Sequence, residues 1–311
     1  MPTVYACESS NHFQQNHFLH ISPITLSSQK EPISLMKASF YSILLFLLVN
    51  APVSGVIYST GTHVISSNLN DSLIIEGDAD VTFTDGAKAF DIEVRDSAVF
   101  SMSAGEIATS LNAFGGHTYI SGGTFNTAGV LTSGVFASDY AYVRFEGASV
   151  AVISASTDLL NSLPGQNPVI DFYGGTVTSG VWTQEQGVVN IFGGTLNVSE
   201  TGLNSDGHIN IYGGVFGLGS YISGGSWDGG NMNIYGSTFN YPFGIIPDTS
   251  GTVSGTLSDG NLVSLTFLDE DLSVGRRTAT IDLKAVPEPG TFALLASGAI
   301  FALVLGGRRK S

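Results

Sequence analysis

The stretch VVNIFGGTLNV, from Val188 to Val198, contains a short motif that returns throughout the middle of the chain. The motif is an apolar residue, any residue, two small residues, any residue and a second apolar residue. Its copies begin at Met102, Ile120, Phe145, Phe172, Ile191, Ile211, Ile222 and Ile234. The first small residues of successive copies lie 18, 25, 27, 19, 20, 11 and 12 residues apart. Such repetition predicts an array of stacked structural units.

The residues around each copy have the pattern of a strand followed by a corner. Apolar and polar residues alternate before the small pair, which is the period of a β-strand. Glycine pairs suit corners, because glycine tolerates positive φ and close backbone approach. Gaps of 19 or 20 residues match one coil of a parallel β-helix, gaps near 26 a coil with an inserted loop, and the last two gaps part-coils.

We therefore predict an all-β protein whose body, residues 56–240, is a right-handed parallel β-helix, a solenoid with one continuous core of Ile, Phe and Val rows. A β-sandwich or a β-propeller remains an alternative, because both also have many short strands and glycines. The stretch from Thr252 to Val274 predicts antiparallel strands, so we expect residues 241–275 to form a small C-terminal β cap. Residues 276–285 are expected to be a linker.

Charge and cysteine content limit the possible partners. Residues 56–285 contain 23 acidic residues and 6 Lys and Arg, a net charge of -17, which would repel phosphate backbones. We therefore expect no nucleic acid partner. The only cysteine is Cys7, so the body contains no disulfide framework and no cysteine-based zinc site.

A signal peptide is predicted at residues 36–55. Met36 and one Lys precede an apolar segment from Phe40 to Val49, and Val53 and Gly55 have signal-peptidase spacing. Signal peptidase and the export machinery are therefore expected partners. Because signal peptides normally open a chain, we favour translation from Met36 and treat residues 1–35 as untranslated; a disordered leader ahead of a membrane anchor is the alternative.

The other end, residues 286–311, has three parts in a fixed order. Val286, Pro287, Glu288 and Pro289 come first, and the two prolines favour an extended, accessible segment. An apolar run at residues 291–307 follows, which as a helix would be about 25 Å long and barely able to span a bilayer. Arg308, Arg309 and Lys310 then keep that end in the cytoplasm, so the body faces out.

This order closely resembles the PEP-CTERM sorting signal of Gram-negative bacteria, which is also described as an ice-binding protein C-terminal domain. The resemblance implies an exosortase substrate: a membrane protease-transpeptidase recognises the tail, in hosts that often make exopolysaccharide or biofilm. It also implies membrane anchoring through the C-terminal helix before processing, and a place at the cell surface or in the extracellular matrix afterwards. An ordinary C-terminal anchor is the alternative. The resemblance implies nothing about the body.

The body offers few groups for chemistry. Its acids are scattered singly and no cation lies in a repeating position beside an acidic cluster, so we find no catalytic residues. We expect no cofactor and no metal, because Asp269, Glu270 and Asp271 lack the spacing of known calcium loops. His63, His117 and His208 are isolated.

One hydroxyl pattern remains. Thr124, Thr176, Thr195 and Thr238 each follow a small pair, and coils stacked in register would align them in a column that could bind ice or a carbohydrate lattice. A simpler explanation is that Thr favours exposed strand positions. The sequence as a whole favours an exported, non-catalytic structural or adhesive protein of the surface or biofilm matrix, associated with exopolysaccharide or other glycans. A polysaccharide lyase or hydrolase and an ice or glycan binder are the alternatives.

Overall fold

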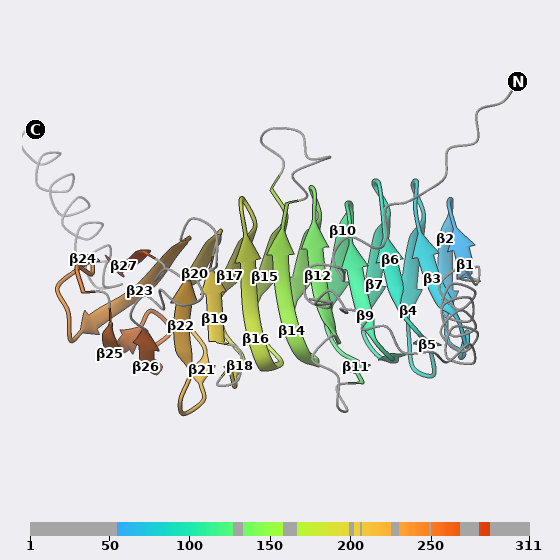
Figure 1. The fold of residues 1–311 in the computed structure, drawn as a ribbon. Coiled ribbons are helices and arrows are strands. Elements are labelled where there is room, and N and C mark those ends of the chain that lie inside the picture. Colours follow the sequence, from blue (N-terminus) through green and yellow to red (C-terminus); the bar gives the residue numbers. More distant parts are fainter. Residues whose placement is uncertain are drawn as a thin grey trace, which may run out of the picture. The chain divides into compact units, whose positions relative to one another are not determined.

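The structure is a computed structural model. It describes residues 55–126, 133–157, 167–198, 202–205, 207–224, 230–248, 250–267 and 280–286. All of these belong to one compact unit, Val53–Ser311. Within the described ranges the regular structure consists of strands, with no helix (Figure 1).

The strands line three faces of the coil, which we call sheets 1, 2 and 3, and each face takes about one strand from every coil. Long strands such as β14 and β16 pass from one face to the next and join the faces into one continuous sheet. Sheet 1 contains β1 (Gly55–Tyr58), β3 (Ser72–Ile75), β6 (Ile92–Val94), β9 (Ser110–Ala113), β12 (Gly134–Ser138), the second halves of β14 (Ser149–Ser156) and β16 (Thr176–Gln184), β19 (Gly202–Ser205) and β22 (Tyr221–Gly224). Sheet 2 contains β2 (Thr62–Ile65), β4 (Asp80–Phe83), β7 (Val99–Met102), β10 (His117–Ile120), β13 (Tyr142–Phe145), β15 (Val169–Phe172), β17 (Val188–Ile191), β20 (His208–Ile211), β23 (Asn231–Phe239) and β27 (Thr280–Ala285). Sheet 3 contains β5 (Lys88–Ala89), β8 (Glu106–Ile107), β11 (Thr124–Phe125), the first halves of β14 and β16, β18 (Thr195–Leu196) and β21 (Val215–Phe216).

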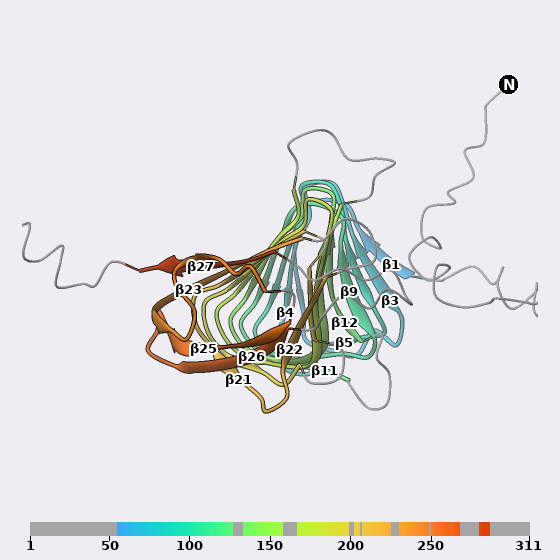
Figure 2. The same ribbon diagram turned by 60° about the vertical axis from the view of Figure 1, so that its left-hand side comes forward.

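Neighbouring strands within each sheet are parallel and lie one coil apart in the sequence. In sheet 2, for example, Val188 pairs with His208 and Ile191 with Ile211. Figure 2 views the stack more nearly along its axis and shows the coils superposed around a common interior. These parallel sheets confirm the all-β, β-helix-like prediction and do not fit a β-propeller or an antiparallel sandwich, whereas the right hand of the helix stays a prediction.

The core is made by the side chains that alternate inward. Along sheet 2, from β4 onward, the second and fourth residue of each strand are buried, and the fourth-position row includes Phe83, Met102, Ile120, Phe145, Phe172, Ile191, Ile211 and Ile234. Rings in this row touch across coils: the centroids of Phe145 and Phe172 are 5.3 Å apart. The predicted continuous core of apolar rows is therefore present.

Corner glycines are required where coils stack closely. Gly175 has φ +95°, and a Cβ there would lie 2.4 Å from the carbonyl oxygen of Ala148 in the neighbouring coil. This is the position that the small pair was predicted to occupy. The part-coil interpretation also holds, because Ile211 pairs with Ile234 in sheet 2 while Ile222 pairs with Leu203 in sheet 1.

The C-terminal strands include the antiparallel strands that we expected and one strand where we expected a linker. β25 (Gly251–Leu257) and β26 (Leu262–Phe267) form an antiparallel pair, and β24 (Gly244–Ile245) is antiparallel to β27. The predicted linker at residues 276–285 is wrong for its second half, because residues 280–285 form β27, which pairs in parallel with β23. Its alternation explains this, since Ile281 and Leu283 are buried.

Both targeting segments fall almost wholly outside the described residues. Of the signal peptide only Gly55 is described, as the first residue of β1, and of the sorting tail only Val286. Among the residues that the structure describes, no helix is long and apolar enough to cross a membrane.

Candidate functional site

The outer face of sheet 2 carries the most distinctive side chains of the protein. The first and third residue of each strand, and the residue that follows the fourth, point outward because side chains alternate. Stacking in register turns each of these positions into a column with one residue per coil. Two columns, in the coils from β15 to β23, consist of aromatic and amide side chains.

The aromatic column contains Tyr173, Phe192, Tyr212 and Tyr235. Successive ring centroids are 4.6, 4.9 and 4.2 Å apart, and the interplanar angles are 12°, 8° and 15°. These separations are close to the spacing of neighbouring strands, about 4.8 Å. The rings therefore cover one another's faces and present their edges to solvent. Burial, followed by a hydrogen bond with Tyr235, raises the pKa of Tyr212 to about 12.

The amide column runs beside it, two residues earlier in each coil. Asn233 Nδ2 donates to Asn210 Oδ1, Asn210 Nδ2 to Asn190 Oδ1, and Asn190 Nδ2 to Asp171 Oδ1, each at 2.8 Å. Every amide donates in the same direction. We call this chain of hydrogen bonds the amide relay. It ends on Asp171 because a carboxylate only accepts hydrogen bonds.

Asp171 is held from its other side by Tyr142. The Tyr142 hydroxyl donates to Asp171 Oδ2 at 2.9 Å. Burial first, and then the hydrogen bond to the charged Asp171, raise the pKa of Tyr142 to about 12. Both carboxylate oxygens of Asp171 are therefore engaged, which makes this acid a poor general base.

A second group of side chains lies on the same face, on β10 and β13 and directly after β15. It consists of four aromatic residues and one arginine, and we call it the tyrosine patch: His117, Tyr119, Tyr142, Arg144 and Tyr173. The rings of His117 and Tyr119 are stacked with centroids 6.3 Å apart, and Tyr142 contacts both edge-on. The Arg144 guanidinium lies 4.8 Å from the Tyr173 ring centroid. Tyr119 is 39% exposed and Tyr173 is 41% exposed.

The charge of Arg144 is largely satisfied locally. Its guanidinium forms an ion pair with Glu146, with a nitrogen–oxygen distance of 2.6 Å. The hydrogen bond to Glu146 and its negative charge raise the pKa of Arg144. The cation is thus oriented over the Tyr173 ring by a carboxylate two residues further along the chain.

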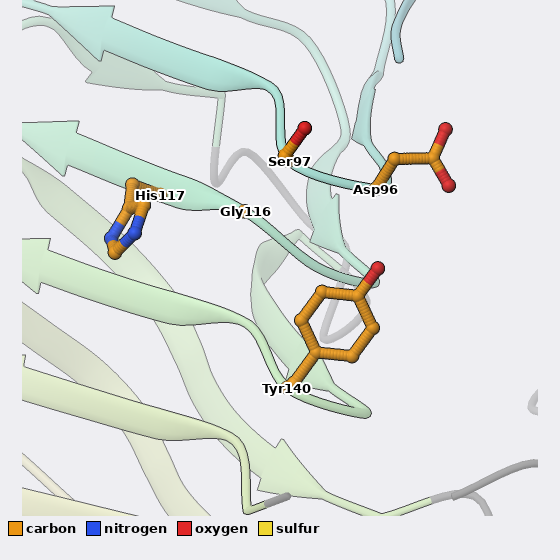
Figure 3. A pocket seen from close by; sticks show the side chains of 5 residues that line it. All are labelled: Asp96, Ser97, Gly116, His117 and Tyr140. Atoms are coloured by element: carbon orange, nitrogen blue, oxygen red, sulfur yellow. The ribbon is translucent and has the colours of Figure 1, made fainter. Parts of the chain in front are cut away.

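Two shallow depressions lie at the two ends of β10. One, of about 480 Å³, is lined by Asp96, Ser97, Gly116, His117 and Tyr140, which come from successive coils (Figure 3). The other, of about 250 Å³, is lined by Tyr119, Ile120, Ser121, Arg144 and Glu146. Ligand pockets for small molecules usually measure about 300–1,000 Å³, so the first depression is within this range and the second is below it. Both are open to solvent and neither is an enclosed cavity.

The Tyr140 phenol of the first depression is not poised for acid–base chemistry. Burial, Asp96 and Asp139 together raise the pKa of Tyr140, so its phenol stays neutral. Within the described ranges no three His, Cys, Asp or Glu side chains are grouped to hold a metal ion. The arrangement can supply hydroxyl, amide and guanidinium hydrogen bonds around aromatic surfaces.

The predicted hydroxyl column is present in part. Thr124 pairs with Ser149, Ser149 with Thr176, and Thr176 with Thr195, all on sheet 3. Glu106 precedes this column and Val215 follows it. Thr238 does not belong to it: it lies in the second half of β23 and pairs with Thr256 of the antiparallel β25. The prediction for Thr238 is wrong because β23 does not end at its small pair, as the corresponding strands of the other coils do, but continues through Phe239.

The other predicted site residues concern export. Val286 N–H donates to the carbonyl of Gly236 at 3.1 Å, so the sorting motif begins directly at the end of β27. Pro287, Glu288, Pro289, Val53, Arg308, Arg309 and Lys310 lie outside the described residues.

Our reading of the sequence overlooked the aromatic and amide columns. The signal was available: VIDFYGG, VVNIFGG, HINIYGG and NMNIYGS each place Asp or Asn two residues before an aromatic residue. The period that buries the apolar rows in these stretches also turns the Asp, Asn and aromatic side chains outward.

Comparison with family models identifies a PEP-CTERM protein-sorting motif at residues 285–310. Comparison with curated proteins and with solved structures gives no match for the chain. The motif confirms the resemblance of the tail. It indicates an exported protein that exosortase processes and that is anchored transiently at the membrane before processing.

Proposed function

We propose that the protein is an exported, non-catalytic structural or adhesive protein of the cell surface or extracellular matrix, and that the outer face of sheet 2 binds a glycan of that matrix. The glycan is an exopolysaccharide chain that lies across the tyrosine patch, with sugar units in the two depressions. Export and exosortase processing bring the body to the place where such chains accumulate.

One observation carries this proposal: exposed tyrosines and oriented polar groups lie between two open depressions. A sugar ring has apolar C–H faces and a rim of hydroxyls, so it is matched by aromatic surfaces next to hydrogen-bonding groups. Tyrosine offers both in one rigid side chain, which loses little entropy on binding. Around the smaller depression, Tyr119 offers aromatic surface and Arg144 offers hydrogen-bond donors, and Tyr173 beside them offers its ring edge and hydroxyl.

Binding fits the site better than cleavage. Glycosidases need two free carboxyl groups facing one another across the scissile bond. The acids that contact the patch are engaged, Asp171 by Tyr142 and Asn190, and Glu146 by Arg144. In the first depression, Asp96 Oδ2 accepts from the Gly77 N–H. This supports the non-catalytic alternative over a polysaccharide lyase or hydrolase.

The test is retention of the purified protein by exopolysaccharide from its own host, measured by affinity electrophoresis. The variant Tyr119→Ala/Tyr173→Ala should lose at least about tenfold in affinity, which corresponds to about 1.4 kcal/mol. Phe90→Ala, which removes an exposed aromatic ring outside sheet 2, is the matched control. Equal retention of the two variants would contradict a role of the tyrosine patch in binding. New reducing ends or unsaturated products would show that the protein cleaves the polysaccharide and would contradict the non-catalytic proposal.

The hydroxyl column supports a second candidate, binding to ice or a regular carbohydrate lattice, because Thr124, Thr176 and Thr195 align in register with Ser149. The column is narrow, since each sheet 3 segment is short and Val215 ends it. A thermal-hysteresis assay tests this candidate, and activity that is lost in Thr176→Val would establish it.

A further inference from the structure

The described body ends where the sorting motif begins, without an intervening linker. β27 pairs with β23 through Ala285, and Val286 is still hydrogen-bonded to Gly236. Only residues 287–290 separate Val286 from the apolar run at residues 291–307. The folded body is thus joined to the membrane segment by a very short stretch of chain.

The length of that stretch limits how far the body can stand from lipid. Five residue steps from Val286 to Thr291 span at most about 18 Å when fully extended. The apolar run would be about 25 Å long as a helix, which is less than the roughly 30 Å of bilayer hydrocarbon. None of it is therefore left over as a spacer. Before processing, the end of β27 stays within about 18 Å of the hydrocarbon boundary.

A small apolar surface lies beside this exit point, next to the ion pair of Lys284 with Asp282. β24 pairs antiparallel with β27, with Gly244 opposite Leu283 and Ile245 opposite Asp282 (Figure 1). Phe243 is 49% exposed and Ile245 is 66% exposed; we call these two residues the terminal patch. Phe243 is held in place by the Phe239 ring, whose centroid is 5.8 Å away.

The segment that carries the terminal patch is uncharged, and its charged neighbours on β27, Asp282 and Lys284, neutralise each other in an ion pair. The segment from Phe239 to Ile246 reads FNYPFGII and contains no charged residue, whereas residues 56–285 carry a net charge of -17. Acidic surfaces are repelled by anionic lipid headgroups. The uncharged segment is the part of this end that can approach a bilayer without that cost.

We propose that, in the precursor, the terminal patch rests in the headgroup region of the membrane that the sorting tail enters. Two exposed apolar side chains are a weak membrane ligand alone, but the short tail supplies a high local concentration of lipid. The contact would hold the body in one orientation while the sorting motif is processed. This inference rests on the membrane anchoring of the precursor and is independent of glycan binding.

Depth-dependent fluorescence quenching tests the contact. The full-length precursor, with Cys7→Ser, is labelled at Ile245→Cys or at Phe90→Cys with an environment-sensitive fluorophore. It is then reconstituted into vesicles of phosphatidylethanolamine and phosphatidylglycerol that contain a spin-labelled lipid. Phe90 is exposed and lies between β5 and β6, at the other end of the stack from β24 (Figure 1).

The headgroup layer is only about 5–8 Å deep, so we expect the probe at position 245 to be quenched roughly threefold or more strongly than the probe at position 90. Introducing Phe243→Glu should reduce that quenching at least about twofold, because a carboxylate opposes entry into the interface. Equal quenching at both positions, or no effect of Phe243→Glu, overturns the proposal.

Two other occupants of the terminal patch give distinct results. Shielding of the probe at position 245 that appears only when exosortase is co-reconstituted would assign the terminal patch to the enzyme and overturn lipid contact. Concentration-dependent shielding in detergent, without vesicles, would assign it to a second copy of the chain and would also overturn it. Glycan retention, measured separately, is unaffected in either case.

Discussion

Replacing Asn190 with Asp tests the amide relay at its most sensitive point. Asn190 Nδ2 donates to Asp171 Oδ1 at 2.8 Å, and Asn190 Oδ1 accepts from Asn210. Aspartate has nearly the same shape as asparagine, so Asn190→Asp changes one hydrogen-bond donor into an acceptor and adds a charge. The new carboxylate then directly faces the carboxylate of Asp171.

The expected loss of stability is large at neutral pH. Losing a hydrogen bond to a charged group removes about 1.5–3 kcal/mol. Two carboxylates about 4 Å apart repel by about 1 kcal/mol in water and about 4 kcal/mol at an effective dielectric constant of 20. Because the site is partly buried, we expect a total of roughly 3–6 kcal/mol. At about 2–4 °C per kcal/mol, the melting temperature should fall by roughly 6–24 °C.

The sign of the pH dependence identifies the cause. Repulsion raises the pKa of the paired carboxylates in the folded state. The variant therefore binds a proton more readily when folded, and its deficit against the natural protein is fully present at pH 7 and shrinks as the pH falls through that raised pKa. Circular dichroism melts of both proteins at about pH 7 and pH 4 measure the difference.

Asn210→Asp is the matched control, because its carboxylate would face the Asn190 amide and not Asp171. We expect it to lose only about 1–2 kcal/mol, with little recovery at low pH. Equal losses in the two variants, or the same Asn190→Asp deficit at both pH values, would refute the relay as drawn.

Three further changes have definite expected outcomes. Gly175→Ala should lower the free energy of unfolding by about 3 kcal/mol, because φ is +95° and the new Cβ would meet the backbone of Ala148. Gly260→Ala should lower it by only about 1 kcal/mol, because nothing lies within 4 Å of its Cβ. Equal losses in thermal unfolding would contradict the stacking argument. Tyr142→Phe should destabilise by about 1–3 kcal/mol at neutral pH. The phenol's folded pKa is raised from 10.0 to about 12, so its contribution is fully present below pH 10 and the variant's deficit should close as pH rises toward 12; a deficit that persists in alkaline melts would contradict the Asp171 hydrogen bond. Replacing Pro287-Glu288-Pro289 with three alanines should leave the precursor membrane-bound in cell fractions, and normal release would contradict the role of the motif.

The fold was accessible from the sequence because two signals agreed at each corner. In VVNIFGGTLNV the strand period sets which residues face inward, and the glycine pair sets where the chain turns. β27 was missed because TIDLKA contains the strand period but no small pair, so its place beside β23 depends on pairing with a distant segment. Thr238 was misplaced for the converse reason: β23 contains the motif but continues past it into an antiparallel pair.

The columns on the outer face of sheet 2 were harder to predict, because they exist only when the coils are stacked in register. A Tyr or Asn in one coil is an ordinary exposed residue, and it becomes part of a column when the inward rows and corner glycines fix the register. Once register is fixed, hydrogen bonds such as Asn210 to Asn190 form without further cost in backbone order. The sequence could reveal the repeated spacing, but not the relay's end on Asp171 or the contact of Arg144 with Tyr173.

That same stacking favours recognition over catalysis on this face. A column repeats the same kind of side chain from coil to coil. Acid–base catalysis instead needs two different groups, both free of other partners, at a defined distance. Asp171 is the one acid at the end of the amide column, where Asn190 donates to one carboxylate oxygen and the Tyr142 hydroxyl donates to the other. A ligand that meets this face therefore finds tyrosine hydroxyls, ring edges and an oriented guanidinium, groups that hold a polymer without activating its bonds. The proposed retention by exopolysaccharide, and its expected loss in Tyr119→Ala/Tyr173→Ala, rest on that distribution of groups.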